Sequence, residues 1–567
     1  MSVVAALLAV PFFFVGLGRA PFDDPGEGMH AEIARELAVS GDPLVLTLNG
    51  VRYLDKPPLL YALLAGAFAA SRRDETAARA VPAAAALVAV AAVTWLGTRL
   101  MDEARGLVAG VALLTSGAFF AYGRYVRPET LFVAALAAGF ALGLAGLVER
   151  RRALVGLAAV AAGVAGLAKD PVGAVLPPLA IVAAAAVAGR ARECWRLLPW
   201  WGIVAWAVLG FGWWAIAEAR TTGAAWYTVV DNHLFNVMRA RRFPDEDVPL
   251  SALQFLVVAA VGAAPWTIAA VIALVDLVRR RAWRDARELP WIALALWAVG
   301  VVGATVLSPF RLPHYGLPAY PALALLAARA WRADRARTLI VLHGAAFAAL
   351  AAACVLAWSS DGRVFIDDVM SATDVATRKT AAVGQAAVLP WPALRWLLGY
   401  AGVVFAAGAV ALALAWARRG WFGARRDVVG VIVVSLTMLA VMPAVASGLT
   451  AVAKHRAVRG LAWEIARAAG PTDIVAHEGP IENSGAFEWY SARRPVIVNG
   501  RQSVLGFGAT RAESVDVFWE PSRLREAWAT ARVWLLTVRA PERSIAASLP
   551  GARLVAAEGG RWLYVNR

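Results

Sequence analysis

The sequence predicts an α-helical protein that crosses a membrane many times and carries a soluble α/β domain at its C-terminal end. Three observations lead to this fold class. Hydrophobic residues make up 60% of the 567 residues, against about 45–50% in ordinary soluble domains. Only 17% of the residues are charged. Long apolar runs follow one another as far as residue 449, where the character of the chain changes.

The composition excludes several classes of protein. The apolar excess rules out a disordered chain and argues against a soluble enzyme. Two cysteines, Cys194 and Cys354, are too few for a disulfide framework or a cysteine-based zinc module. The net charge of +16 comes from arginines in short clusters between apolar runs. That pattern is typical of membrane loops, so no nucleic-acid partner is predicted.

The apolar runs predict about 13 transmembrane helices, since a spanning helix needs about 20 mostly apolar residues. No Lys or Arg precedes the first run and no small-x-small cleavage site follows it, so we expect a retained helix rather than a signal peptide. The predicted spans are 2–18, 80–100, 105–122, 128–148, 153–168, 172–188, 197–217, 251–278, 289–307, 315–331, 338–358, 396–417 and 427–449.

The positive-inside rule predicts whether a shorter apolar run at 58–71 crosses the membrane. If this run does not cross, the first loop covers residues 19–79 on the outer face, and the later arginine clusters all fall on the cytoplasmic side. If it crosses, every later cluster faces outward. We therefore predict a juxtamembrane helix at 58–71. The clusters in question are Arg99 with Arg105, and residues 150–152, 190–196, 279–284, 329–337 and 418–426.

The division into domains follows from the same change in composition. Residues 1–449 form the predicted transmembrane domain, and residues 450–567 form an α/β domain on the outer face. Short β-like runs alternate there with helical stretches. The predicted strands are 474–476, 495–499, 533–538 and 562–565, and the predicted helices are 454–469 and 521–530.

The outer loops hold most of the unusual polar residues. A turn-forming run at 23–28 leads into an amphipathic helix at 30–39, and the loop ends near Lys56. Carboxylates supply a base or bind a metal, and lysine pairs with phosphate. Acids and a lysine near a membrane surface therefore suit a phosphorylated, hydroxyl-bearing substrate. A solvated loop that caps a helix is the plainer alternative.

Basic and acidic residues at the membrane boundary give further candidates. Lysine is rare in this arginine-rich chain, which draws attention to Lys56 and Lys169. Lys169 and Asp170 lie between two apolar runs, where an ionisable pair is either functional or an interfacial anchor. Glu129 enters an apolar helix, so we expect Arg127, Lys56 or a bound ligand to compensate its charge.

Two more loop segments carry candidates. His233 lies in the loop 218–250, where a lone histidine is more often structural than a ligand. Arg311 and Tyr315 join two spans on the outer face, where they can hold a phosphate. The chain has no P-loop, GxSxG, HExxH or paired-cysteine motif, so ATP-driven chemistry and zinc proteolysis have no support. A lipid-linked substrate needs no soluble cofactor.

Taken together, these segments resemble bacterial type-C glycosyltransferases related to the aminoarabinose–lipid A transferase. More distantly, they are similar to protein O-mannosyltransferases. The resemblance implies the type-C glycosyltransferase fold, with 13 spans and a C-terminal periplasmic domain in the inner membrane. It rests on HAEIAREL and GDPLVLTLNGVRYLDKPPLLY within 30–61, RYVRPETLF at 124–132, LAKDPVGAVLP at 167–177, DNHL at 231–234 and SPFRLPHYGLPAYPALALL at 308–326.

The resemblance also implies roles for residues in this chain. Asp55 and Lys56 match an acidic-Lys-Pro-Pro motif whose lysine is expected to hold the donor phosphate. Glu129 matches the second acidic position, and Lys169 matches the lysine of a Lys-Gly-Pro motif. Further phosphate or cavity candidates are Arg311, Tyr315, Arg127 and His233.

The first loop departs from the family pattern Asp-Glu-x-Arg-Tyr-Ala-Glu-Ile. In that register Gly26 replaces the Asp expected to be catalytic, and Met29 replaces the Arg. Either Glu27 or Asp24 takes over the role of the acid, or the acceptor is a phosphate anion that needs little deprotonation. A homologue that has lost its activity is the remaining alternative.

The predicted activity is transfer of a sugar from a polyprenyl-phosphate donor to a lipid A-like acceptor on the periplasmic face. Lys56, Lys169 and Arg311 would neutralise the leaving phosphate. Glu27 or Asp24, together with Glu129, would orient or deprotonate the acceptor. No cofactor is firmly implied, although a divalent metal ion between Asp55 and Glu129 is conceivable from their chemistry.

Two other functions stay open. A protein O-glycosyltransferase of the same superfamily would need a true base, because its acceptor is a hydroxyl group. A secondary transporter is the alternative from another class. Transporters usually show paired repeats and helices broken at the midplane. Here the polar residues gather at one face and no repeat is visible, which argues against transport.

Overall fold

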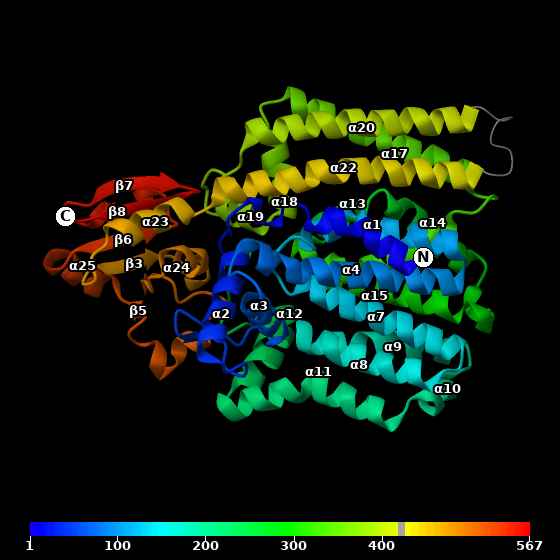
Figure 1. Ribbon diagram of the computed structural model, residues 1–567, viewed down its shortest axis with the longest axis horizontal. Helices are drawn as coiled ribbons and strands as arrows, with labels where there is room; N and C mark the ends of the chain where they lie inside the picture. Colours follow the sequence, from blue (N-terminus) through cyan, green and yellow to red (C-terminus); the bar gives the residue numbers. More distant parts are fainter. Residues whose placement is uncertain (418–425) are drawn as a thin grey trace.

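The computed structural model describes residues 1–417 and 426–567. A helical bundle forms one end of the molecule and a six-stranded sheet with its helices forms the other (Figure 1). The N-terminus lies in the bundle, and the C-terminus lies beside the sheet at the opposite end (Figure 1). The predicted order of a helical region followed by an α/β region is confirmed.

The bundle consists of apolar helices of unequal length. Within the described residues, eight helices are long and apolar enough to cross a membrane, and a ninth counts if the bent pair α13 (Ala252–Gly262) and α14 (Trp266–Arg279) is one span. The eight contain α1 (Ser2–Phe14), α4 (Glu75–Leu100), α7 (Glu129–Val148), α11 (Trp200–Arg220), α15 (Leu289–Leu307), α17 (Ala336–Ser359), α20 (Trp391–Ala417) and α22 (Arg426–Arg456).

The remaining predicted spans correspond to short or broken helices. The run at 105–122 divides into α5 (Glu103–Leu114) and α6 (Gly117–Tyr122), and the run at 315–331 divides into a 3-10 turn and α16 (Tyr320–Ala330). The number 13 therefore stays a prediction. Shorter apolar helices are α3 (Leu59–Ala70), α8 (Arg152–Ala168) and α9 (Pro171–Val187), and α3 coincides with the predicted juxtamembrane helix.

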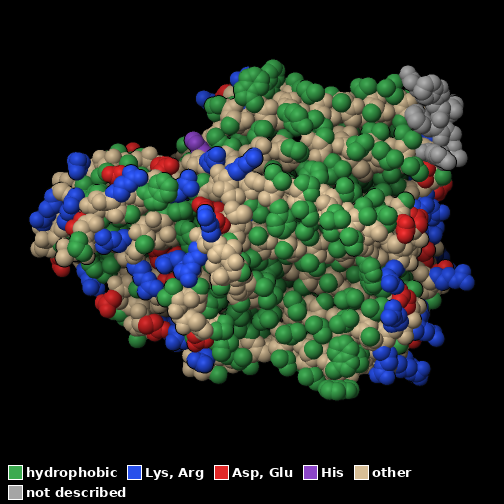
Figure 2. Space-filling view, in the orientation of Figure 1, with side chains coloured by type: hydrophobic (Ala, Val, Ile, Leu, Met, Phe, Trp, Pro, Cys, Tyr) green, Lys and Arg blue, Asp and Glu red, His purple; other side chains and the backbone are tan. Residues whose placement is uncertain are grey.

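The surface of the bundle is that of a multi-pass membrane protein. Large apolar side chains such as Leu7, Val208 and Val403 are exposed on it, and Figure 2 shows them as a broad apolar belt. Soluble monomers rarely expose such an area. Lys and Arg side chains gather at the end of the bundle opposite the sheet (Figure 2), near α10 (Ala191–Leu197). The predicted basic cluster at 418–426 lies, apart from Arg426, outside the described residues.

Close helix packing explains the many small residues of the bundle. An added Cβ at Gly97 would lie 2.9 Å from the Cα of Gly106, so the backbones of α4 and α5 nearly touch. Small residues permit this approach in membranes, where van der Waals packing drives association. Between α7 and α15, the rings of Phe140 and Trp297 stack with centroids 3.8 Å apart.

The C-terminal sheet has the strand order β5-β4-β3-β6-β8-β7. The first four strands are parallel to one another, and β8 pairs antiparallel with both β6 and β7. All four predicted strands are confirmed, while β5 and β7 were not predicted. The strands are β3 (Ile474–Glu478), β4 (Val496–Val498), β5 (Phe518–Trp519), β6 (Val533–Thr537), β7 (Arg553–Glu558) and β8 (Arg561–Val565); the main helices are α23 (Arg459–Ala468), α24 (Gly485–Ser491) and α25 (Pro521–Thr530).

The sheet region is firmly joined to the bundle. Helix α22 continues past the predicted boundary at residue 450 and ends at Arg456. Helix α2 (Glu27–Ser40) packs on α24, and a Cβ at Gly485 would lie 2.5 Å from the backbone of Met29. The Tyr490 hydroxyl accepts from the backbone N–H of Phe22 at 2.8 Å. The first loop is therefore held between the bundle and the α/β region.

Candidate active site

The first charged cluster surrounds Glu129, the first residue of α7. Its buried carboxylate lies 3.6 Å from Lys169 Nζ, 3.5 Å from Arg127 Nε and 3.4 Å from His314 Nε2. The expectation that a basic residue compensates Glu129 is confirmed for Arg127. None of these distances is that of a short ion pair. Within the described chain, Arg127 Nε and Glu129 Oε2 are buried without a hydrogen-bond partner.

Lys169 follows the end of α8 and points toward this cluster. Its ammonium lies 5.5 Å from the ring centroid of Phe132 and 5.4 Å from that of Tyr315, within range of cation–π attraction. Asp170 instead caps α9 by accepting from the N–H of Val172 at 3.0 Å. Lys169 and Asp170 thus have separate roles, and the idea that they form an interfacial ion pair is not supported.

The second cluster surrounds Asp55 and Lys56, whose side chains form an ion pair at 2.7 Å. Asn232 donates to Asp55 Oδ1 at 2.7 Å and accepts from Arg241 at 2.7 Å. Arg241 in turn pairs with Asp245 at 2.8 Å. Burial is the largest single effect and would raise the pKa of Asp55, but the charge and hydrogen bond of Lys56 together with the charge of Arg241 outweigh it, so that pKa is lowered. Asp55 is therefore an ionised residue that holds Lys56 in place.

A small hairpin presents Asp55 and Lys56. Its strands β1 (Thr47–Leu48) and β2 (Val51–Arg52) are joined by Asn49 and Gly50, both with positive φ, as an Asn-Gly hairpin turn requires. Arg52 anchors the second strand by donating to Glu513 of the α/β domain at 2.5 Å and to the hydroxyl of Thr221. The local sequence thus fixes where the chain enters the site.

His30 lies between the two clusters. Its Nδ1 is hydrogen-bonded to the Tyr61 hydroxyl at 2.9 Å, and the charges of Arg127, Glu129 and Lys56 all act on its imidazole. Burial is the main cause that lowers the pKa of His30 to about 3. The ring is therefore neutral at physiological pH. The two clusters therefore lie close enough for their charges to act on one imidazole.

Glu27 is fully engaged away from these lysines. Its carboxylate forms a two-point ion pair with Arg79, with Nε to Oε1 at 2.8 Å, and Oε1 also accepts from the N–H of Val126 at 3.1 Å. Arg79 donates in addition to the carbonyls of Leu17 and Ala20. These contacts favour a positioning role. The predicted role of Glu27 as a base has no direct test here and stays a prediction.

Asp24 faces the α/β domain. Its Oδ1 accepts from the N–H of Ala486 at 2.8 Å, and Arg561 donates to its backbone carbonyl at 3.2 Å. Its Oδ2 is buried with no hydrogen-bond partner in the described part of the chain. Burial raises the pKa of Asp24 to about 7, although Arg561 opposes the shift. The predicted catalytic role of Asp24 also stays a prediction.

The structure gives a reason for the glycine at position 26. A Cβ there would overlap the hydroxyl of Tyr125. That hydroxyl donates to Asp23 Oδ1 at 2.8 Å. Tyr125 and Asp23 therefore fill the space that a side chain at position 26 would need, and the loop has no room for an acid at this point.

The other candidates lie around the same region and differ in how many contacts hold their side chains. Arg311 donates to three backbone carbonyls, among them that of Leu250 at 2.9 Å, so its guanidinium is largely committed to the loop. Tyr315 forms part of the wall beside Lys169. His233 Nδ1 lies 2.6 Å from the carbonyl of Thr228 inside a π-helical turn, Trp226–Phe235. Their roles in binding phosphate remain predictions.

A metal ion between Asp55 and Glu129 does not fit the residues present. Asp55 is neutralised by Lys56, and Glu129 is flanked by Lys169 and Arg127. Divalent cations such as Ca²⁺ and Mg²⁺ prefer several oxygen ligands, usually including carboxylates. The positive side chains of Lys56, Lys169 and Arg127 would repel a divalent cation at this place.

Sequence reasoning missed five residues of the site. Asn232 stands in the segment DNHL, and His30 and His314 stand in segments that carried the family resemblance, so their positions were visible although their roles were not. Arg241 and Asp245 lie in an irregular loop after a π-helical turn, where no periodic pattern links them to Asp55.

The described chain is a polytopic membrane protein whose fold is similar to that of ArnT. Two crystal structures of ArnT from Cupriavidus metallidurans, one bound to undecaprenyl phosphate and one in the apo state, match with TM-scores of 0.79 and 0.78 at 21% and 22% identity. The matches cover 100% of this chain and 98% and 97% of those chains.

Sequence comparison gives the particular relatives. The family model described as dolichyl-phosphate-mannose-protein mannosyltransferase matches residues 55–214. The undecaprenyl phosphate-alpha-4-amino-4-deoxy-L-arabinose arabinosyl transferases of Pectobacterium carotovorum and Pectobacterium atrosepticum are each 27% identical, over 344 and 347 residues. Each alignment covers 58% of this chain, and the chain spans 58% of the length of these curated relatives. The resemblance drawn from the sequence motifs is thereby confirmed.

Proposed function

We propose that this chain is an integral membrane glycosyltransferase that moves a sugar from a polyprenyl-phosphate donor to a lipid acceptor. The observation that carries the proposal is the group Lys56, Arg127 and Lys169. Arg127 and Lys169 flank Glu129, and the charge of Lys56 acts on the same imidazole as that of Arg127. Arg127 Nε has no hydrogen-bond partner among the described residues. A lipid-linked phosphate would supply the missing acceptor oxygens. Both named groups of relatives, the arabinosyl transferases and ArnT, involve undecaprenyl phosphate.

The charges suit the bond that breaks. As the acceptor oxygen attacks the sugar, the bond from the anomeric carbon to the phosphate oxygen breaks and the electron pair stays on the phosphate. Lys56 and Lys169 would stabilise that growing negative charge, which is the kind of electrostatic effect that dominates many enzymes. Glu129 and Asp55 would hold the cations in position. Neutral His30 adds no repulsion toward them.

The state of the predicted bases favours an acceptor that is already ionised. Glu27 is held by Arg79, and Asp24 faces Ala486 in the α/β domain. A hydroxyl acceptor must lose a proton to a positioned base. A phosphate anion is already deprotonated and needs no such base. This argument supports a phosphorylated, lipid A-like acceptor over a protein hydroxyl.

A protein acceptor is the second candidate function. The match of residues 55–214 to the protein mannosyltransferase model favours it. Its acceptor would be a Ser or Thr hydroxyl, so transfer would depend on a carboxylate or imidazole near the donor. Label recovered in envelope protein rather than in lipid would select this function.

A transfer assay tests the proposal. Purified protein in detergent is supplied with radiolabelled polyprenyl-phosphate sugars and with envelope lipid and protein as acceptors. We expect label in the lipid fraction and a loss of at least 100-fold in both Lys56→Ala and Glu129→Ala. Lys56→Ala removes a charge that contributes roughly 3 kcal/mol, and Glu129→Ala releases the cations that it positions. Lys454→Ala is the matched control, because Lys454 is exposed at the end of α22. Transfer that survives both site variants would refute the assigned site.

We further propose that the protein lies in the bacterial inner membrane with residues 450–567 in the periplasm. The basic end of the bundle, opposite the sheet, supports this orientation by the positive-inside rule. In a cysteine-free background, Arg525→Cys should react with an impermeant maleimide added to intact spheroplasts, and Arg192→Cys should not. The reverse labelling would overturn the orientation.

A further inference from the structure

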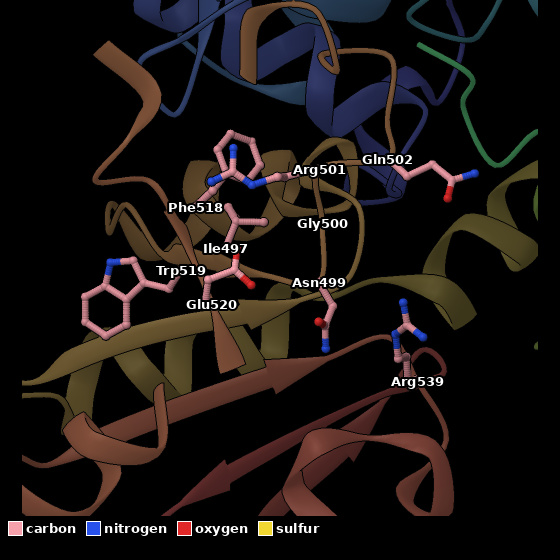
Figure 3. A pocket seen from close by; sticks show the side chains of 9 residues that line it. All are labelled: Ile497, Asn499, Gly500, Arg501, Gln502, Phe518, Trp519, Glu520 and Arg539. Carbon is pink, nitrogen blue, oxygen red and sulfur yellow. The ribbon is translucent and has the colours of Figure 1, made fainter. Parts of the chain in front are cut away.

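A cavity of about 480 Å³ lies at the carboxyl edge of the parallel strands in the α/β domain. Figure 3 shows its side chains arranged around the ends of the strands. Asn499, Arg501 and Gln502 belong to the turn after β4, Glu520 follows β5, and Arg539 comes shortly after β6. The cavity is therefore built by three strand ends and is separate from the charged clusters at the membrane.

The polar groups of the cavity differ in their partners. Asn499 donates to Glu478 at 3.4 Å and Arg501 donates to the carbonyl of Ala509 at 3.2 Å, whereas Arg539 is not satisfied among the residues described. In the described chain, the guanidinium of Arg539 has no hydrogen bond, and its Nε is fully buried. The side chains of Glu520 and Gln502 form no hydrogen bond within the described residues, but both are exposed to solvent. Buried polar groups are nearly always hydrogen-bonded, because leaving one without a partner costs about 1–3 kcal/mol. The buried Nε of Arg539 is therefore in the state expected of a site that a polar ligand completes.

A hydrogen-bond network around Glu478 adjoins the cavity through Asn499. Glu478, at the end of β3, accepts from Thr537 at 2.8 Å, from Ser544 at 2.5 Å and from the N–H of Ile545 at 3.0 Å. Asn499 reaches the same carboxylate at 3.4 Å. The chain turns from β3 to one side for β4 and β5 and to the other side for β6. Ligands of open α/β sheets bind at such a switch in strand order.

Residues 504–513, which follow the lining residue Gln502 in the sequence, connect the cavity to the membrane site. The carbonyl of Val504 accepts from the Tyr227 hydroxyl at 3.0 Å, and Phe507 stacks on Tyr227 with centroids 4.7 Å apart. Glu513 pairs with Arg52, four positions before Lys56. A group bound in the cavity would thus be held by the same segment that positions the proposed donor site.

We propose that this cavity binds a non-reacting sugar phosphate of the acceptor headgroup, because the phosphate that attacks the donor must lie at the membrane site. Arg539 supplies a planar donor for phosphate, and Arg501, which lies 4.9 Å from the Phe518 centroid, adds a second positive charge. Gln502 and Glu520 provide the donors and acceptors that sugar hydroxyls or an amine require. A cavity of this volume falls in the range of small-molecule sites, about 300–1,000 Å³. The inference rests on the proposed transfer to a phosphorylated lipid.

Direct binding tests the inference without any transfer reaction. The full-length protein in lipid nanodiscs is titrated with glucosamine 1-phosphate by saturation-transfer NMR, with no donor present. We expect saturable binding that weakens about tenfold or more in Arg539→Gln, the loss typical of one hydrogen bond to a charged group. Gln502→Ala, a change at an exposed side chain, should weaken binding by a smaller factor. Arg525→Gln, exposed on α25, is the matched control.

The outcomes separate this inference from the proposed function. Equal binding to wild type and Arg539→Gln, or equally strong competition by glucosamine or by inorganic phosphate alone, would overturn it. Transfer activity without any binding of glucosamine 1-phosphate would also overturn it while leaving the proposed function intact. In the transfer assay, Arg539→Gln should raise KM for the lipid acceptor and leave kcat and the donor KM unchanged. Specific binding in a protein that transfers no sugar would support the ligand class and refute the proposed reaction.

Discussion

The Glu27–Arg79 ion pair predicts a large loss of stability when Glu27 becomes Gln. The two side chains are only 1% and 6% exposed, so water cannot replace the missing charge. Arg79 would keep its bonds to the carbonyls of Leu17 and Ala20 but lose its counter-charge. Removing one partner of a buried pair costs about 3–5 kcal/mol. Arg79→Met should cost a similar amount.

A double-mutant cycle checks this reasoning. The free energy of unfolding is measured by SDS titration in mixed micelles for both single variants, for the double variant and for Glu526→Gln, a control at an exposed site on α25. The loss of unfolding free energy in the double variant should be smaller than the sum of the two single-variant losses by roughly 1–3 kcal/mol. If Glu27→Gln kept wild-type stability and lost sugar transfer, Glu27 would be a base and the positioning role would be wrong.

Three further perturbations follow from the structure. The pKa of Asp24 is raised from 3.8 to about 7, so the free energy of unfolding should fall by up to about 4 kcal/mol as pH rises between these values. Asp24→Asn should therefore reduce the difference in unfolding free energy between pH 5 and pH 8. Gly26→Asp should lower the melting temperature through overlap with Tyr125, and adding Tyr125→Ala should restore part of it in a thermal-shift assay. Trp297→Ala should cost about 3–5 kcal/mol in an SDS titration, because it removes the stacked partner of Phe140; an unchanged midpoint would contradict the packing described.

Much of the fold could be predicted because membrane proteins follow simple rules. Apolar length predicted the multi-pass bundle and the short apolar helix at 58–71, while its juxtamembrane placement, inferred from the arginines, stays a prediction. Strands β3 and β6 were visible as buried apolar runs. Strand β5 has only two residues and β7 is largely exposed, so neither carries a hydrophobic pattern that distinguishes it from a loop.

The candidate site was predictable in part for a different reason. Lys56, Lys169 and Glu129 stood out because charged residues at a membrane boundary are rare, and the structure brings Lys169 and Glu129 together. The partner of Glu27 was not predictable. Arg79 lies 52 positions away in α4, and nothing in the local sequence distinguishes an acid that will meet an arginine from one that will meet a substrate.

The contacts of the first loop have a consequence for how the protein is made. Phe22 bonds to Tyr490 across 468 positions, and Asp24 bonds to Arg561 across 537. Pairings between such distant parts of a chain form late, because the loop between them must close first. During synthesis, the N-terminal loop would therefore wait, with its polar groups still hydrated, until almost every helix had been inserted. A ribosome stalled before residue 486 would leave a bundle in the membrane whose first loop lacks its contacts with the α/β domain.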